Sequence, residues 1–118
     1  MRAGMLLDID SGAVIVGHVE RTTTPWERVR GLLGRTPLAD DAGLWLVPCN
    51  SVHTAFMAYP IDVVFLDRAL VVLHIVRALA PWRSALRMRA HSTLELKPGG
   101  AVACELAVGQ GLRWQAAA

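Results

Sequence analysis

The sequence contains few of the residues that define metal-stapled or disulfide-stapled domains. Its 118 residues include two cysteines, Cys49 and Cys104, and no Cys or Cys/His pair at the spacing of a structural zinc site. A chain of this length buries a sufficient core without a disulfide, so the sequence leaves open whether the two thiols are close in space. We expect no resident metal and no cofactor, although a His/Asp site assembled in space stays open.

The sequence also lacks a large excess of one charge sign and lacks long apolar segments. Lys and Arg total 12 against 10 Asp and Glu, and a formal net charge of +2 is too small to predict nucleic-acid binding. The first ten residues have only a short apolar stretch before Asp8 and Asp10, and the most apolar segment, 63–76, is interrupted by Asp67 and Arg68. That segment is also shorter than the roughly 20 residues that span a bilayer. We therefore expect a cytoplasmic protein without membrane contact.

Hydrophobic residues dominate the remaining composition. They make up 53% of the chain against 19% charged residues, which excludes a disordered chain. No repeat, low-complexity tract or linker divides the sequence, so we predict a single domain over residues 1–118.

Most of the chain has the pattern of short strands, in which β-branched and large apolar residues are separated by turn-forming residues. We predict strands at 13–20, 44–48, 51–57, 61–67, 70–79, 93–97, 101–108 and 112–115. The segment 80–92 is predicted to be mostly loop. Its basic residues, with Arg77, are interpreted as solvated, and Trp82 is expected to close the core.

One helix is predicted over residues 24–35. Thr24 and Glu27 have the spacing of a capping box, and Pro25 occupies the first helical position, where its missing N–H does no harm. An apolar face follows, and Gly34 is a suitable C-terminal stop. The residues of that face are Trp26, Val29 and Leu33. The whole pattern predicts a mainly β fold on the border of α+β: a small, antiparallel-rich, barrel-like sheet of about seven strands with one helix in the N-terminal half.

The stretch CNSVHTAFMAYPIDVVFLD, residues 49–67, carries the candidate functional residues. In an extended conformation, alternate side chains from Cys49 onward point to one face. These are Cys49, Ser51, His53, Ala55 and Met57. A strip of polar residues within an apolar region predicts a small binding cleft, with Ser51, His53, Met57 and Asp62 as its candidate residues. A structural alternative stays open, in which His53 bonds a carbonyl or carboxylate and Asp62 accepts backbone N–H groups.

A hydrolase is a second reading of the same stretch. Strand spacing would hold Cys49 and His53 roughly 13 Å apart, which is too far for a thiolate–imidazole pair. Ser51 and His53 would be neighbours, with Asp62 needed to orient the imidazole, but Ser51 lacks the flanking glycines of a nucleophile elbow. We therefore assign no catalytic residue. Cys104 is expected to be a small core residue on a strand.

Several ordered blocks give the chain a family resemblance. ERVRGLLGR, GLWL, the stretch 49–67, Pro81-Trp82-Arg83 and TLELKPGGA resemble domain-of-unknown-function family 192 over roughly residues 14–115. The family positions are Arg28, Gly31, Leu32, Gly43, Met57, Pro60, Asp62, Phe65, Glu95 and Gly100. The wider family often has a Phe-Trp-Met-Lys-Asn-Thr-like block where this chain has AFMAY, and the preceding SVHT indicates a variant. The resemblance implies a β-rich, barrel-like domain with one helix near its start, and it supplies no reaction.

The leading functional hypothesis is therefore a non-catalytic binding module for a small ligand or a peptide segment. The alternatives are a Ser- or Cys-based hydrolase that uses Ser51 or Cys49 with His53, and a structural protein that binds a protein partner through a sheet edge or the helix at Trp26 and Arg28.

Overall fold

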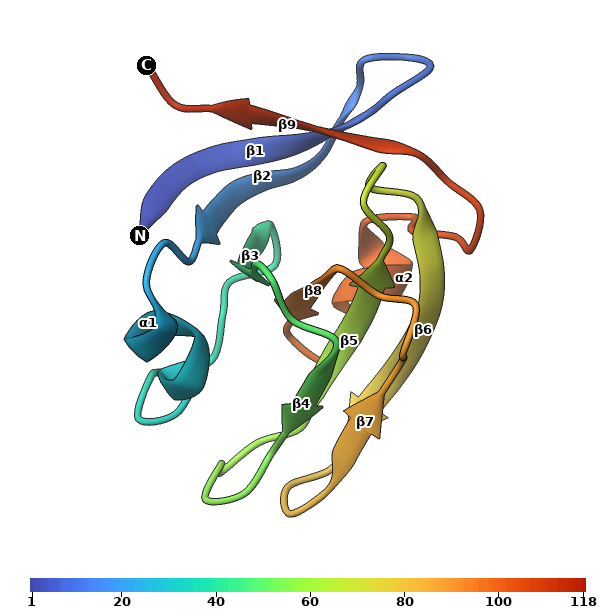
Figure 1. Cartoon of the computed structure of the whole chain (residues 1–118). Helices are drawn as coiled ribbons and strands as arrows, with labels where there is room; N and C mark the ends of the chain where they lie inside the picture. Colours follow the sequence, from blue (N-terminus) through green and yellow to red (C-terminus); the bar gives the residue numbers. More distant parts are fainter.

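The computed structural model describes residues 1–118, which form nine strands and two short helices (Figure 1). In chain order these are β1 Arg2–Asp8, β2 Val14–Arg21, α1 Pro25–Arg30, β3 Ala42–Leu46, β4 Ser51–His53, β5 Ile61–Leu66, β6 Val72–Leu79, β7 Ser84–Leu86, β8 Ser92–Leu96, α2 Gly100–Ala103 and β9 Leu112–Ala116. Neither helix has the length and apolarity needed to cross a membrane.

Seven strands form one mixed sheet in the order β6-β5-β8-β3-β2-β1-β9. The pair β2–β3 is parallel, because the chain between these strands crosses over through α1, and the other neighbours are antiparallel. β4 and β7 pair separately and extend beyond the main sheet in Figure 1.

The prediction of a mainly β fold is confirmed, but the sheet does not close into a barrel. It curls until its edge strands approach one another, and there the isolated bridge between Val71 and Gly111 joins them. Leu106, from the turn after α2, is buried in the same apolar cluster as Val72 and Leu112. Side-chain packing, rather than a continuous ladder of hydrogen bonds, therefore fills this part of the curl.

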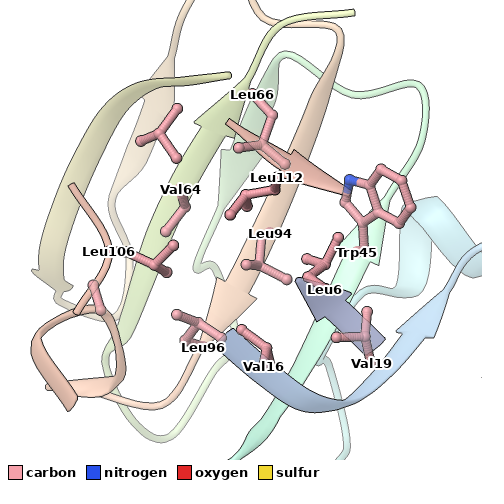
Figure 2. Packing of buried hydrophobic residues seen from close by; sticks show 12 residues of the cluster. Leu6, Val16, Val19, Trp45, Val64, Leu66, Leu94, Leu96, Leu106 and Leu112 are labelled. Atoms are coloured by element: carbon pink, nitrogen blue, oxygen red, sulfur yellow. The ribbon is translucent and has the colours of Figure 1, made fainter. Parts of the chain in front are cut away.

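The two faces of the sheet pack against two different apolar clusters. Figure 2 shows the first, inside the curl, where Leu94 and Leu96 of β8 meet Val16, Leu6 and Trp45. The second cluster lies on the opposite face, and its buried members are Leu32, Leu44, Leu46, Val52, Met57, Ile61, Val63 and Phe65. β5 and β8 are buried along their whole length because both of their faces are covered.

Two segments differ from the strand predictions. Residues 101–108 were expected to be a strand, but they begin with α2, and Cys104 caps that helix instead of alternating along a sheet. Gly99 adopts the left-handed conformation (φ 82°), so the Lys97–Gly100 turn leads into a helix. β1 was not predicted, and only Ser51–His53 of the expected strand 51–57 is extended and paired.

The start of α1 follows the prediction, whereas its apolar face does not. The Thr24 hydroxyl accepts the Glu27 N–H at 3.2 Å and the Glu27 carboxylate accepts the Thr24 N–H at 3.1 Å, which completes the capping box. Trp26 and Val29 are 71% and 70% exposed, because the helix ends at Arg30 and is held instead by the buried Leu32.

Trp82 does not close the core. Its side chain is 59% exposed and packs against the exposed Phe56, with the two ring centroids 4.7 Å apart. The buried Thr54 holds the two loops together, since it exchanges backbone hydrogen bonds with Trp82 and Arg83. The two aromatic side chains therefore lie outside both apolar clusters.

Candidate functional site

A cavity of about 400 Å³ lies between the end of α1 and the chain segment that carries β4. Its lining comes from three parts of the fold: α1 with the turn that follows it, residues 46–57, and one residue of β8. The lining residues are Arg28, Val29, Arg30, Gly31, Leu32, Leu33, Leu46, Pro48, Cys49, Asn50, Ser51, Val52, His53, Ala55, Met57 and Glu95.

Glu95 is the single acidic residue of this lining and reaches it from the middle of the sheet. Leu94 and Leu96 point into the curl (Figure 2), so strand alternation directs Glu95 to the opposite face. Its register partners on that face are Leu44 in β3 and Val63 in β5, and both are buried members of the second apolar cluster. A carboxyl group therefore lies between aliphatic side chains.

No group of the protein compensates the charge of Glu95. The residue is 5% exposed, and its carboxylate takes part in none of the side-chain hydrogen bonds or ion pairs of the protein. Burial raises the pKa of Glu95 from 4.5 to about 7, because removal from water disfavours the charged form. A buried, unpartnered carboxylate that faces a cavity is the feature expected where a ligand completes the hydrogen bonding.

Gly31 allows the end of α1 to lie directly over this carboxylate. Its backbone (φ 51°, ψ −126°) is in a region open to glycine alone, and its N–H donates to the Glu27 carbonyl at 3.0 Å. A Cβ at this position would lie 3.5 Å from Oε1 of Glu95. Glycine thus ends the helix and also leaves the space above Glu95 open.

Replacing Gly31 by alanine is expected to destabilise the protein by about 2 kcal/mol, since alanine resists this positive φ. The added methyl group would also narrow the cavity above Glu95. Urea unfolding measures the loss, with Gly34→Ala as a matched control. Gly34 has a positive φ as well, but a Cβ added there would meet no atom within 4 Å, so strain alone operates at that position.

The β4 segment forms the opposite wall of the cavity. Three of the four residues expected from sequence, Ser51, His53 and Met57, lie in its lining together with Cys49. The Cys49 thiol donates to the Ser51 carbonyl at 3.0 Å, so it is not directed at the imidazole. No hydrogen bond joins His53 to Cys49 or to the Ser51 hydroxyl, and the structure thus offers no nucleophile–base pair of the kind a hydrolase uses.

Asp62, the fourth expected site residue, lies elsewhere. It is fully buried, and its two oxygens accept the Ala78 N–H at 2.8 Å and the Ala101 N–H at 3.0 Å. The carboxylate therefore fastens β5 to an irregular point of β6 and to the first turn of α2. It does not line the cavity and does not orient His53. Asp62 therefore has the structural role that the sequence left open as an alternative, that of a carboxylate accepting backbone N–H groups.

Other parts of the protein offer fewer groups suited to catalysis or ligand binding. Both cysteines are free, and no group of three His, Cys, Asp or Glu residues is placed to hold a metal ion. A second cavity of about 450 Å³ lies between β1, β2, β3 and the chain after α1. It contains Arg35, whose Nε is buried without a partner but whose Nη1 lies 3.6 Å from Glu20.

Glu95 is the site residue that sequence reasoning missed. It was recognised only as a family position, without a role. The signal was present in the alternation Leu94-Glu95-Leu96, because a charged residue at the centre of a strand covered on both faces is seldom buried unless it has a partner.

The structure therefore defines a small β-rich domain with a ligand-sized cavity between a helix end and a curled sheet. Residues 4–114 match the model of the family DUF192, described as "Uncharacterized ACR, COG1430". The chain belongs to this family, as its resemblance implied. A UPF0127 protein of Thermococcus sibiricus is 37% identical over 84 residues, which is 67% of this chain and 53% of that protein. The chain thus spans about half the length of this curated relative.

Two crystal structures share the fold. A protein of unknown function from Novosphingobium aromaticivorans has a TM-score of 0.75 at 20% identity, and the match covers 95% of this chain and 84% of that one. A putative transcription regulator from Sinorhizobium meliloti has a TM-score of 0.80 at 21% identity, with coverage of 97% and 94%. At this level of identity the likeness shows the fold alone.

Proposed function

We propose that the protein is a binding module whose cavity beneath α1 takes a small ligand or one side chain of a peptide. The observation that carries this proposal is Glu95, a buried carboxylate that faces the cavity without a partner. The other buried carboxylate of this protein, Asp62, is satisfied internally by two backbone N–H groups. Glu95 departs from that pattern at the point where a cavity opens.

The composition of the cavity supports the same function. Its volume of about 400 Å³ falls within the usual range for small-molecule sites, roughly 300–1,000 Å³. Leu32, Leu46, Val52 and Met57 supply apolar wall, and a few polar groups converge on the space between them. Such a combination selects a ligand by shape and by a small number of hydrogen bonds.

Thermal-shift screening followed by NMR titration tests the proposal. We expect ligands that stabilise the protein to shift the amide signals of Gly31, Ser51 and Glu95. Ser51→Phe should block the cavity and abolish the shifts, because residue 51 lines it. Val102→Phe is the control, since Val102 is an exposed residue of α2 that lies outside the lining.

Two results would count against this function. Ligands that bind Ser51→Phe and wild type equally well would place the site elsewhere. New resonances from a cleaved ligand, lost in Ser51→Ala or Cys49→Ala, would indicate the hydrolase alternative instead.

A further inference from the structure

We propose, resting on the binding function above, that the ligand is an organic cation whose ammonium or guanidinium head enters the cavity and pairs with Glu95. An ionised carboxylate only accepts hydrogen bonds, and Glu95 has no donor from the protein. A cationic nitrogen supplies both donors and the opposite charge, and such charge-assisted bonds are the strong ones. An anionic head would face repulsion from the same group.

The walls around Glu95 set the shape of this ligand. Leu32, Leu46 and Met57 are buried apolar side chains that line the cavity with Glu95, so the region next to the head group suits a short apolar stem. A thin head on an aliphatic stem fits the space under Gly31 better than a wide polar ring, because even a Cβ added at Gly31 would be in van der Waals contact with Oε1.

Two positive charges in the α1 part of the lining limit what else the ligand can carry. Arg28 and Arg30 line the cavity from α1, and neither forms an ion pair with a carboxylate. Burial alone accounts for the raised pKa of Glu95, so these guanidinium groups do not compensate it. They disfavour a second positive charge on the ligand and favour a carboxylate at its outer end.

A series of small amines tests the charge requirement by NMR titration of the wild-type protein. Butylamine and 5-aminopentanoate should shift the signals of Glu95 and Gly31, with 5-aminopentanoate the tighter binder. Pentanoate should not bind, and 1,5-diaminopentane should bind more weakly than butylamine. A capped lysine, Nα-acetyl-lysine N-methylamide, presents the same head on a peptide backbone. Its affinity relative to butylamine distinguishes a peptide source from a free amine.

The dependence on pH separates Glu95 from the other groups that face the cavity. Affinity for butylamine should rise about tenfold per pH unit below about pH 7 and level off above it, because only ionised Glu95 pairs with the cation. The other titratable or charged groups nearby are Arg28, Arg30, Cys49 and His53 in the lining, and Tyr59 and Arg35 beside it. The rise should persist in His53→Gln and in Cys49→Ala.

Glu95→Gln should weaken butylamine binding by about 10- to 100-fold and flatten its pH profile. Its amide is nearly isosteric, so the cavity remains. If pentanoate or pentanamide binds at Glu95 more tightly than butylamine, the cation class is wrong while the binding function stands. No shift from any amine up to about 10 mM would also overturn the cation class, and the library screen would then decide the binding function independently.

Discussion

Replacing Glu95 by glutamine is expected to stabilise the folded protein by about 3 kcal/mol at pH 8 and to have little effect at pH 4. The pKa of Glu95 is about 7 in the folded protein and 4.5 where the group is unperturbed. The folded state therefore holds its proton more tightly than the unfolded state does. Stability is lost as the pH rises from about 4.5 through about 7, and the full penalty applies above that range.

Urea unfolding of wild type and Glu95→Gln at both pH values measures this effect, with tryptophan fluorescence as the signal. A gain of this size would raise the Tm by roughly 10 °C. Glu105→Gln is the matched control, because Glu105 is exposed and its replacement should change stability by no more than about 0.5 kcal/mol. Equal stability of Glu95→Gln and wild type at pH 8 would show that the carboxylate finds a partner or water in the folded state.

Asp62→Ala is expected to destabilise the protein by about 4 kcal/mol, in the opposite direction to the change at Glu95. The substitution removes an acceptor from two backbone N–H groups, one of them on the buried Ala101 at the start of α2. Buried donors without acceptors carry their full desolvation penalty. Equilibrium unfolding in urea gives the value.

Asp67→Ala is the control for Asp62→Ala, because it also removes a carboxylate that accepts hydrogen bonds from two backbone N–H groups. Asp67 accepts the Ala69 and Val71 N–H groups at 2.9 Å, but in a partly exposed turn where water can replace it, so a loss of about 1 kcal/mol is expected. Asp62→Asn keeps one acceptor and should fold with intact butylamine affinity, since Asp62 does not line the cavity. If folded Asp62→Asn lost amine binding, Asp62 would belong to the site after all.

These two acidic residues show how far the sequence determines the site. Three of the four expected residues, Ser51, His53 and Met57, do line one cavity, but not through alternation, since the chain is extended only over Ser51–His53 and Val52 lines the same cavity. Alternation also did not distinguish Asp62 from Glu95, because both are single acidic residues within apolar strands. Their roles depend on tertiary contacts: α2 and a bulge of β6 bring amides to Asp62, whereas the glycine at position 31 places no side chain and no donor against Glu95.

The fold was predictable to a similar degree. β5 and β6 were evident from their apolar, β-branched composition, and α1 from its capping box. The segment 101–108 was assigned wrongly, since AVACELAV has strand-like alternation and the left-handed Gly99 that starts α2 leaves no distinct local signal. The open sheet could not be predicted either, because closure depends on how strands distant in sequence, β6 and β9, meet.

The stability penalty at Glu95 and the proposed binding function would have one physical cause. Glutamine or a hydrophobic residue at position 95 would make a more stable protein, so the carboxylate costs stability that the proposed binding function would explain. A bound cation would remove the penalty, and ligands should accordingly stabilise wild type more at pH 8 than at pH 5.

The most direct test of Glu95 as the cation-binding carboxylate is the ¹³C signal of its carboxyl group. The signal is followed from pH 4 to pH 9 with and without saturating butylamine. We expect a midpoint of about 7 in the free protein that falls by about one unit or more when the amine is bound. A midpoint near 4.5 in the free protein, or one that the amine leaves unchanged, would contradict the assignment of Glu95 as the cation-binding group.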